Sequence, residues 1–475
     1  MRPKEVATER DRIKEGKRGW SWTLLKFSAW LRRQAWLRSA YSRLPRYWRD
    51  SFSSLLASPM RRSVAFVKTS AWDSPVAGNA SPDCKPGLDL AHQAQSGGVN
   101  IHAYFKGEFG LAESARLYTQ ALMAVSYPVA LRDIAINLPH GMNDTTLAHR
   151  LGNETPYDVH LLFVNPDFLH QALDQIGRAR LAGNYVIACW FWELENVPEA
   201  WLPALELVDE LLVSSRFVED AFRRVTDKPI TCVPLPVMDT GCSELQRRDF
   251  GLRDDAFIFL LTFDFNSWLE RKNPYAVIEA FRLAFPVERQ DVQLLVKSSN
   301  GHRHPVQFMR LMAYAKMDPR IIVRDEVIER RHVQALQRCA DVYVSLHRAE
   351  GFGLGLAESM RHGKPVIATA WSGNMDFMST ADSCLVPFRL VALEEGQYLH
   401  WQGQRWAEAD RAAAAAHMTA LADNPELVRQ LGKAAQDRVS RQLDINAVGA
   451  ALAQRMEQIY VARSKPESPR QEAAQ

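Results

Sequence analysis

Short apolar runs alternate with longer amphipathic stretches along most of the chain from Gly98 onward. Runs such as DVHLLFV (158–164) and FIFLLTFDF (257–265) have the length and β-branched or aromatic content of buried strands. Stretches such as LAESARLYTQALMA (111–124) are typical of helices. Strands that alternate with helices predict parallel sheets wound by βαβ units.

Two such series follow one another. Strands are expected at 98–105, 129–136, 158–164, 185–192 and 210–215, and again at 257–265, 292–299, 320–325, 342–347 and 363–369. Two series of similar size predict two Rossmann-like domains facing a central cleft, at 98–247 and 248–462. A helical stretch at 405–460 is expected to close the second domain. Alternatively, this stretch crosses back and packs on the first domain.

Residues 1–97 read as an N-terminal extension and linker, and 463–475 as a disordered tail. Within the extension, 1–16 are polar, 20–56 hold five of the 13 tryptophans, and 57–97 are rich in Ser, Pro, Gly and Ala. Segment 20–56 places apolar residues along one helical face, with arginines mostly outside it. The expectation is a basic amphipathic helix.

Charge separates this extension from the rest of the chain. Residues 1–62 carry 16 Lys and Arg against 5 Asp and Glu, whereas the remainder carries 42 against 50. A basic, Trp-rich helix suits an anionic membrane surface, and packing on the body or on another protomer is the alternative. Because the positive charge is not spread over a folded domain, a nucleic-acid partner is not expected.

Six scattered cysteines without a C-x-x-C pair indicate reduced thiols rather than a disulfide frame or a zinc site. The sequence contains no run of 18 apolar residues, so we predict no membrane span. The N-terminus is too charged for a signal peptide. We therefore expect a cytoplasmic protein, peripheral on the inner membrane face if segment 20–56 binds lipid.

Segment EGFGLGLAE (350–358) places two carboxylates around three glycines, between an apolar strand and a helix. Ligands bind at this strand-to-helix turn in parallel sheets, and free amides at a helix start favour an anion such as a diphosphate. Glu350 and Glu358 can accept paired hydrogen bonds from vicinal hydroxyls. The simpler alternative is a glycine turn in which an acid at the helix start only interacts with the helix dipole. Two acids, three glycines and a strand on either side disfavour this alternative.

In its context, SLHRAEGFGLGLAESMRHGKPVIAT (345–369) resembles the signature of retaining nucleotide-sugar glycosyltransferases of family 4, which have the GT-B fold. The resemblance covers about residues 98–460. It implies that Glu350 contacts the donor hexose and Glu358 the ribose. It also implies that the amides of Phe352, Gly353 and Leu354 lie near the sugar and phosphates.

Arg271 and Lys272 precede Asn273 and Pro274 at the start of a helix, and cations there would neutralise a leaving diphosphate. In the family an arginine and a lysine do this from the same loop, about five residues apart. Lys272 matches the lysine, Ser267 stands where the arginine is expected, and Arg271 is the candidate substitute. Solvation alone would also explain an Arg-Lys pair.

The first domain offers a glycine loop in FKGEFGLAESAR, where Gly107 and Gly110 flank Glu108 and Arg116 follows. It resembles the loop that covers donor phosphates in the family, and an ordinary βα turn is the alternative. Further candidates for sugar or acceptor contact are Trp190, Trp192, Glu193, Asn165, His347, Asn374 and Asp376. Large aromatics and a strand-end histidine can instead be core residues.

No D-x-D pair occurs in the sequence, so we expect a metal-independent enzyme without a cofactor. The predicted function is transfer of a hexose from a nucleotide-diphosphate sugar to a glycan or lipid-linked acceptor, in surface polysaccharide or lipid-linked glycan assembly. The alternatives are an epimerase or glucan synthase of the same fold, or a non-catalytic membrane-associated scaffold.

Overall fold

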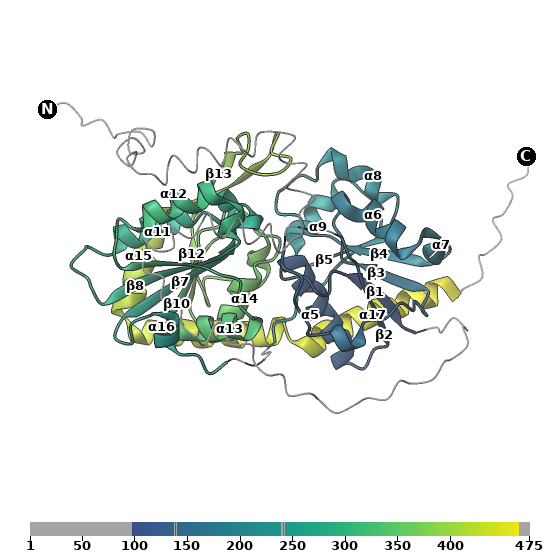
Figure 1. Cartoon of the computed structure of the whole chain (residues 1–475), viewed down its shortest axis with the longest axis horizontal. Helices are drawn as coiled ribbons and strands as arrows, with labels where there is room; N and C mark the ends of the chain where they lie inside the picture. Colours follow the sequence, from purple (N-terminus) through teal and green to yellow (C-terminus); the bar gives the residue numbers. More distant parts are fainter. Residues whose placement is uncertain (1–96, 137, 139, 239–240, 242, 465–475) are drawn as a thin grey trace, which may run out of the picture.

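The computed structural model describes residues 97–136, 138, 140–238, 241 and 243–464 (Figure 1). The predictions for the Trp-rich extension and for the tail beyond 464 lie outside these residues. The described chain forms two α/β units, each built on a six-stranded sheet. The predicted fold class, two Rossmann-like domains, is confirmed.

The first sheet is parallel and has the order β2-β1-β3-β4-β5-β6. Its strands are β1 (Val99–Ala103), β2 (Val129–Asp133), β3 (Val159–Leu162), β4 (Tyr185–Cys189), β5 (Glu210–Val213) and β6 (Ile230–Cys232). Its helices are α5 (Gly110–Ala124), α6 (Pro166–Ile176), α7 (Arg178–Leu181), α8 (Leu202–Leu205) and α9 (Arg216–Arg223). Strands β1, β3 and β5 are wholly buried, as is usual for the inner strands of a parallel sheet.

The second sheet repeats this design in the order β12-β11-β10-β7-β8-β9. Its strands are β7 (Phe257–Asp264), β8 (Val292–Ser299), β9 (Ile321–Asp325), β10 (Val342–Ser345), β11 (Val366–Thr369) and β12 (Cys384–Val386). The helices are α10 (Leu269–Lys272), α11 (Pro274–Ala284), α12 (Pro305–Ala315), α13 (Arg330–Cys339), α14 (Leu354–Arg361), α15 (Arg411–Asp423) and α16 (Pro425–Gln442).

Strand order reverses once in each sheet, between β1 and β3 and between β7 and β10. Loops that leave the carboxyl ends of such a strand pair diverge to opposite sides, so a crevice opens between them. In the second sheet these loops are 265–273, after β7, and 346–353, after β10. The topology therefore brings the two segments that the sequence singled out to one place.

A two-stranded antiparallel hairpin, β13 (Phe388–Ala392) with β14 (Arg405–Ala409), interrupts the second unit between β12 and α15. We call residues 388–409 the β13–β14 hairpin. Leu393, Tyr398 and Trp406 are buried in the same hydrophobic cluster as residues of β4 and β5. The hairpin of the second unit thus packs on the core of the first.

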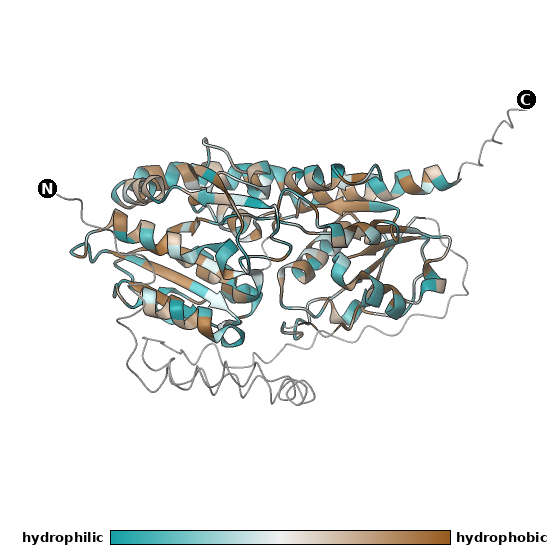
Figure 2. Ribbon diagram, turned by 90° about the horizontal axis from the view of Figure 1, so that it is seen from above, coloured by the Kyte–Doolittle hydropathy of each residue, from teal (hydrophilic) through white to brown (hydrophobic). Residues whose placement is uncertain are grey.

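The last helix, α17 (Ile445–Ser464), crosses back to the first unit (Figures 1 and 2). There it packs against α5 (Figure 1). Arg455 donates to both carboxylate oxygens of the buried Glu210, at 2.8 and 2.6 Å. The Tyr460 hydroxyl donates to the Gly98 carbonyl at 2.7 Å. The range predicted for the second domain, 248–462, therefore includes a helix that packs on the first unit. The end of the expected helical stretch thus crosses back to the first unit.

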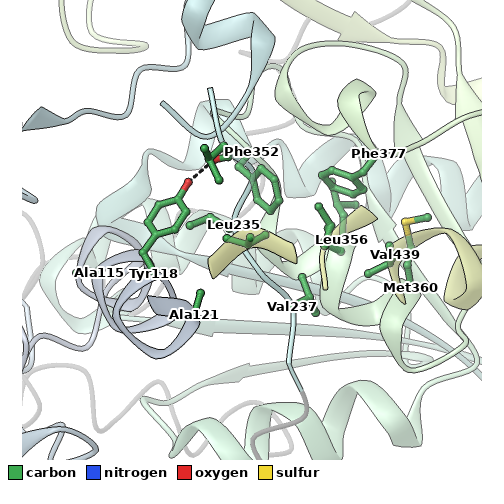
Figure 3. Close-up of a cluster of buried hydrophobic side chains, with 14 of the residues drawn as sticks. Ala115, Tyr118, Ala121, Leu235, Val237, Phe352, Leu356, Met360, Phe377 and Val439 are labelled. Atoms are coloured by element: carbon green, nitrogen blue, oxygen red, sulfur yellow. Dashed lines mark hydrogen bonds between the residues drawn. The ribbon is translucent and has the colours of Figure 1, made fainter. Parts of the chain in front are cut away.

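The segment that joins the two sheets is itself core. Figure 3 shows Leu235 and Val237 between side chains of α5 and of α14, including Tyr118 and Leu356. The Tyr118 hydroxyl donates to the Val233 carbonyl, which fixes the same segment to α5. One continuous hydrophobic cluster thus spans both units.

Four cysteines lie in the described part of the chain, at 189, 232, 339 and 384, and all four are free thiols. Cys84 and Cys242 lie outside it. Among the described helices, none has both the length and the apolar character that crossing a bilayer requires.

Gly449 gives a direct test of the α17 contact, because a Cβ at this position would meet the Ala121 carbonyl of α5. We expect Gly449→Val to lower the free energy of unfolding by about 1–3 kcal/mol, measured by urea denaturation. Ala450→Val on the exposed side of the same helix is the matched control and should cost less than about 1 kcal/mol. Equal effects of the two substitutions would contradict close packing of α17 on α5.

Candidate functional site

The loop after β7 is held in an unusual conformation. Trp268 and Asn273 both have positive φ, at 65° and 50°, and they bracket the single turn of α10. The Asn273 amide donates to the Leu346 carbonyl after β10 at 3.0 Å, and Pro274 begins α11 as expected. Left-handed backbone at non-glycine residues costs free energy, so the surrounding contacts must hold this loop in place.

Glu350, just after β10, is the centre of the site. One carboxylate oxygen accepts a hydrogen bond from Lys272 Nζ, and the other lies 3.1 Å from Arg271 Nη1. Burial alone would raise the pKa of Glu350, but the charges of Lys272 and Arg271 outweigh it and lower the pKa to about 2. Glu350 is therefore a carboxylate at neutral pH.

The two cations respond differently to burial. The pKa of Lys272 is lowered, because the loss of hydration outweighs the attraction of Glu350. The pKa of Arg271 is raised despite burial, because Glu350 and Glu193 both favour its charge. Lys272 keeps 18% of its side chain exposed against 5% for Arg271, so the lysine is the cation of the pair that a ligand can reach.

Arg271 is enclosed by protein groups rather than open to a ligand. It lies between Glu350 and Glu193 of the first unit, whose carboxylate oxygen is 3.7 Å from Nη2. It also donates to the carbonyls of Ala349 at 2.8 Å and Ser267 at 3.2 Å. The Arg271 guanidinium thus supports Glu350, and Ser267 contributes only a carbonyl here. A contact of Arg271 with a departing diphosphate stays a prediction.

Glu358 lies in the second turn of α14 and is buried, with 4% exposure. It accepts a hydrogen bond from the Gln337 amide at 3.1 Å and pairs with Arg330. Arg330 is also 3.3 Å from Glu113 of α5, so it connects the two units. Neither Arg330 nor Glu113 was among the sequence candidates, since a pair separated by more than 200 residues leaves no local pattern.

The glycines between the two acids allow close backbone packing. Gly353 has φ +98° and is the N-cap of α14. Gly351 packs against the backbone of Gly373, where an added Cβ would meet the Gly351 carbonyl. That carbonyl accepts a hydrogen bond from Ser215 Oγ of the first unit at 2.6 Å. Leu354 begins α14, so amides at this start precede the helical hydrogen bonds and are suited to an anion. Phe352 contributes its backbone there, because its ring is buried against Phe377.

The glycine loop of the first unit is held by Arg116. Its Nη1 donates to the carbonyls of Phe105 and Gly107, both at 2.8 Å, and Gly107 closes a tight turn onto Tyr104. Gly110 is the first residue of α5. Burial raises the pKa of Glu108, which accepts a hydrogen bond from Asn143 at 3.1 Å.

The tryptophans of the first unit are core residues, which corrects the suggestion that exposed indoles stack on a sugar. Trp190 and Trp192 are 0% and 2% exposed. Trp192 Nε1 donates to the Asn196 carbonyl at 2.9 Å, and its ring lies edge-on to Trp201. Glu193, the next residue, is partly exposed and faces Arg271 and the Tyr398 hydroxyl.

Four other candidates bond to groups of the protein itself. The Asn165 amide exchanges two hydrogen bonds with the backbone of Phe191, at 3.2 and 3.3 Å. His347 and Asn374 are fully buried and bonded to each other at 3.1 Å, and burial lowers the pKa of His347. Asp376 accepts from the Arg216 amide at 2.7 Å, which links the units. A contact of any of these side chains with a sugar stays a prediction.

Groups of three or more His, Cys, Asp or Glu side chains that could hold a metal ion are absent from the described residues. Metal independence itself stays a prediction.

Residues 259–394, which contain Lys272, Glu350 and Glu358, match the family model described as "Glycosyl transferases group 1". Two curated relatives are similar over part of the chain. "Trehalose synthase" of Pyrococcus horikoshii is 28% identical over 182 residues, and that of Rubrobacter xylanophilus is 27% identical over 195 residues. These matches cover 37% and 40% of this chain and 38% and 41% of the two relatives, so the chain spans about two fifths of their length.

Solved structures share the fold across both units. Sucrose-phosphate synthase of Thermosynechococcus elongatus superposes with a TM-score of 0.55 at 18% identity, over 77% of this chain and 100% of that one. Anabaena HepE, in complex with UDP and glucose, superposes with a TM-score of 0.54 at 13% identity, over 76% and 100%. The chain thus shares the two-domain fold of these structures, and residues 259–394 are similar to the glycosyl transferases group 1 family.

Loss of the Glu350 charge should destabilise the protein in a pH-dependent way. In Glu350→Gln, Lys272 and Arg271 lose a buried counter-charge, and we expect the thermal midpoint at pH 7 to fall by about 5–10 °C. The folded pKa of about 2 lies below the ordinary 4.5, so the wild-type stabilisation is complete above pH 4.5 and is lost as pH falls toward 2.

The difference between wild type and variant should therefore narrow between pH 5 and pH 2, measured by differential scanning calorimetry. Glu395→Gln, at an exposed position, is the control and should shift the midpoint by less than about 1 °C. A difference that stays constant over this range would contradict the ion pairs around Glu350.

Proposed function

We propose that this protein is a retaining glycosyltransferase that moves a hexose from a nucleotide-diphosphate sugar to an acceptor hydroxyl. The observation that carries the proposal is the Lys272–Glu350 pair at the carboxyl ends of β7 and β10, beside the start of α14. A crevice at this reversal of strand order is where parallel sheets bind nucleotides. The match of residues 259–394 to a glycosyl transferase model supports the same assignment.

The proposed chemistry is electrostatic and positional. Lys272 and the amides at the start of α14 take up the negative charge that develops on the diphosphate as its bond to the anomeric carbon breaks. Glu350 holds a sugar hydroxyl, and Glu358 holds the ribose. The acceptor oxygen bonds to the anomeric carbon from the leaving-group face, and its proton passes to the departing phosphate oxygen. This route requires no enzymic nucleophile and gives retention.

Lys272 also supports the proposal of metal independence. A lysine beside a helix start can neutralise a diphosphate without a bridging ion. Sugar transfer should then persist in the presence of EDTA.

Donor chemistry can be tested by substitution. We expect Lys272→Ala to lower kcat by about a hundredfold, because a cation that acts on the leaving group contributes mainly in the transition state. Glu358→Ala should raise the donor Kd by about tenfold through loss of a charge-assisted hydrogen bond to ribose. Hydrolysis of a panel of nucleotide sugars and calorimetric titration with UDP measure the two effects.

Lys316→Ala and Glu395→Ala, both at exposed positions, are matched controls and should retain wild-type values. Full activity in Lys272→Ala would remove the assigned role of the lysine. A donor that changes configuration without an acceptor would identify an epimerase. Failure of the wild-type protein to bind any nucleoside diphosphate would favour a non-catalytic scaffold.

We further propose that the acceptor is a glycan or a lipid-linked glycan of surface polysaccharide assembly, reached at an anionic membrane. The support is the composition of residues 20–56, which contain both tryptophans and arginines.

Flotation with vesicles of anionic lipid tests the membrane proposal. The full chain should float with the vesicles and residues 61–475 should remain at the bottom of the gradient, because tryptophan and arginine in the removed segment provide the binding. The binding should weaken at high salt, since charges at the surface are screened. Sedimentation of the full chain without the vesicles would overturn the proposal.

A further inference from the structure

The β13–β14 hairpin reaches from the second unit onto the loop that follows β4 in the first. Gln404 and Asn196 form a two-way contact, in which the Gln404 amide donates to the Asn196 carbonyl at 2.7 Å and its oxygen accepts from the Asn196 amide at 3.3 Å. Arg405 adds an ion pair to Glu195 at 3.2 Å. These contacts clamp the hairpin at its outer end, where Arg405 is largely exposed.

Tyr398 makes the inner contact of the same hairpin. Its hydroxyl donates to one carboxylate oxygen of Glu193 at 2.6 Å, and its side chain is 7% exposed. Its ring packs edge-on to Trp268, next to the strained turn of α10, with ring centroids 5.6 Å apart. Tyr398 therefore contacts both the first unit and the loop that carries Arg271 and Lys272.

A continuous series of polar contacts runs from this hydroxyl to the candidate site. The second oxygen of Glu193 lies 3.7 Å from Arg271 Nη2, and Arg271 Nη1 lies 3.1 Å from one oxygen of Glu350. The other oxygen of Glu350 accepts from Lys272. Each carboxylate in the series thus divides its two oxygens between two partners.

We propose that Tyr398 is a positioning residue for the transfer reaction, which sets the place of Lys272 through Glu193, Arg271 and Glu350. The inference rests on the proposed function. Without the tyrosine hydroxyl, one oxygen of Glu193 loses its donor and the carboxylate can turn fully toward Arg271. Arg271 then pairs more strongly with Glu193 and less strongly with Glu350. Glu350 and the Lys272 bound to it move relative to the diphosphate.

This role differs from that of a simple clamp between the units. A clamp would affect stability and the closure of the two units, whereas a positioning residue affects the step in which charge develops on the leaving group. Lys272 acts in that step, so misplacement should appear in kcat while the donor KM stays nearly constant. The split between kcat and KM is the readout that a structural role would not produce.

The test compares full-length Tyr398→Phe with Gln404→Ala/Arg405→Ala. The first variant removes one hydroxyl and keeps the ring, and the second removes the outer clamp without touching Glu193. The measurement is hydrolysis of UDP-glucose, or of whichever screened nucleotide sugar the wild type consumes, with thermal midpoints recorded in parallel.

For Tyr398→Phe we expect kcat to fall about 5–20-fold, with the donor KM within about twofold of wild type. For the double variant we expect a lower thermal midpoint and a kcat within about twofold of wild type. Glu193→Gln is a second probe: it keeps an acceptor for Tyr398 but removes the charge beside Arg271, and it should lower kcat at least as much as Tyr398→Phe.

Unchanged kcat in Tyr398→Phe, or an equal fall in the double variant, would overturn the positioning role while the proposed function stands. A wild-type protein that consumes no nucleotide sugar would overturn the proposed function and this inference with it.

Discussion

The compensation of one buried carboxylate is the constraint on which the candidate site depends. Glu350 follows a buried strand, and an unpaired carboxylate there would cost several kcal/mol. Lys272 and Arg271, in the loop after β7, supply the compensating positive charge. Glu193 in turn pairs with Arg271. The positive φ of Trp268 and Asn273 is consistent with this demand, because the loop must turn sharply to bring consecutive basic residues to one acid.

The two units are joined at several places, and some of these contacts involve residues of the candidate site. Ser215 donates to Gly351, Arg330 pairs with both Glu113 and Glu358, and the β13–β14 hairpin carries Tyr398 to Glu193. Behind them, the buried segment at 233–237 and α17 continue the hydrophobic core from one sheet to the other. The first unit therefore contributes to the charge balance of a site whose principal residues belong to the second.

The sequence predicted most strands and helices, because strand and helix periods are local properties, but residues 405–409, expected to be helical, form strand β14. The strands expected at 292–299 and 320–325 coincide with β8 and β9 almost residue for residue. The fate of side chains was less predictable, since it depends on distant partners. Trp192 is buried because Tyr398 and Trp201 pack against it. Arg271 lies between two acids, because Glu193 pairs with it as well as Glu350. Tyr398 lies more than 200 residues from Trp192 in the sequence, and Glu193 lies 78 residues from Arg271, so these two contacts leave no signal within a local motif.

The hydrogen bond from Tyr460 to the Gly98 carbonyl has a geometric consequence for the last helix. Gly98 lies at the amino end of β1, whereas the glycine loop of the first unit follows the carboxyl end of the same strand. A five-residue strand is about 16 Å long, so this bond holds the end of α17 about that far from the loop. A tether fused after residue 464 would therefore hold the body from the side of the first sheet that lies away from the glycine loop.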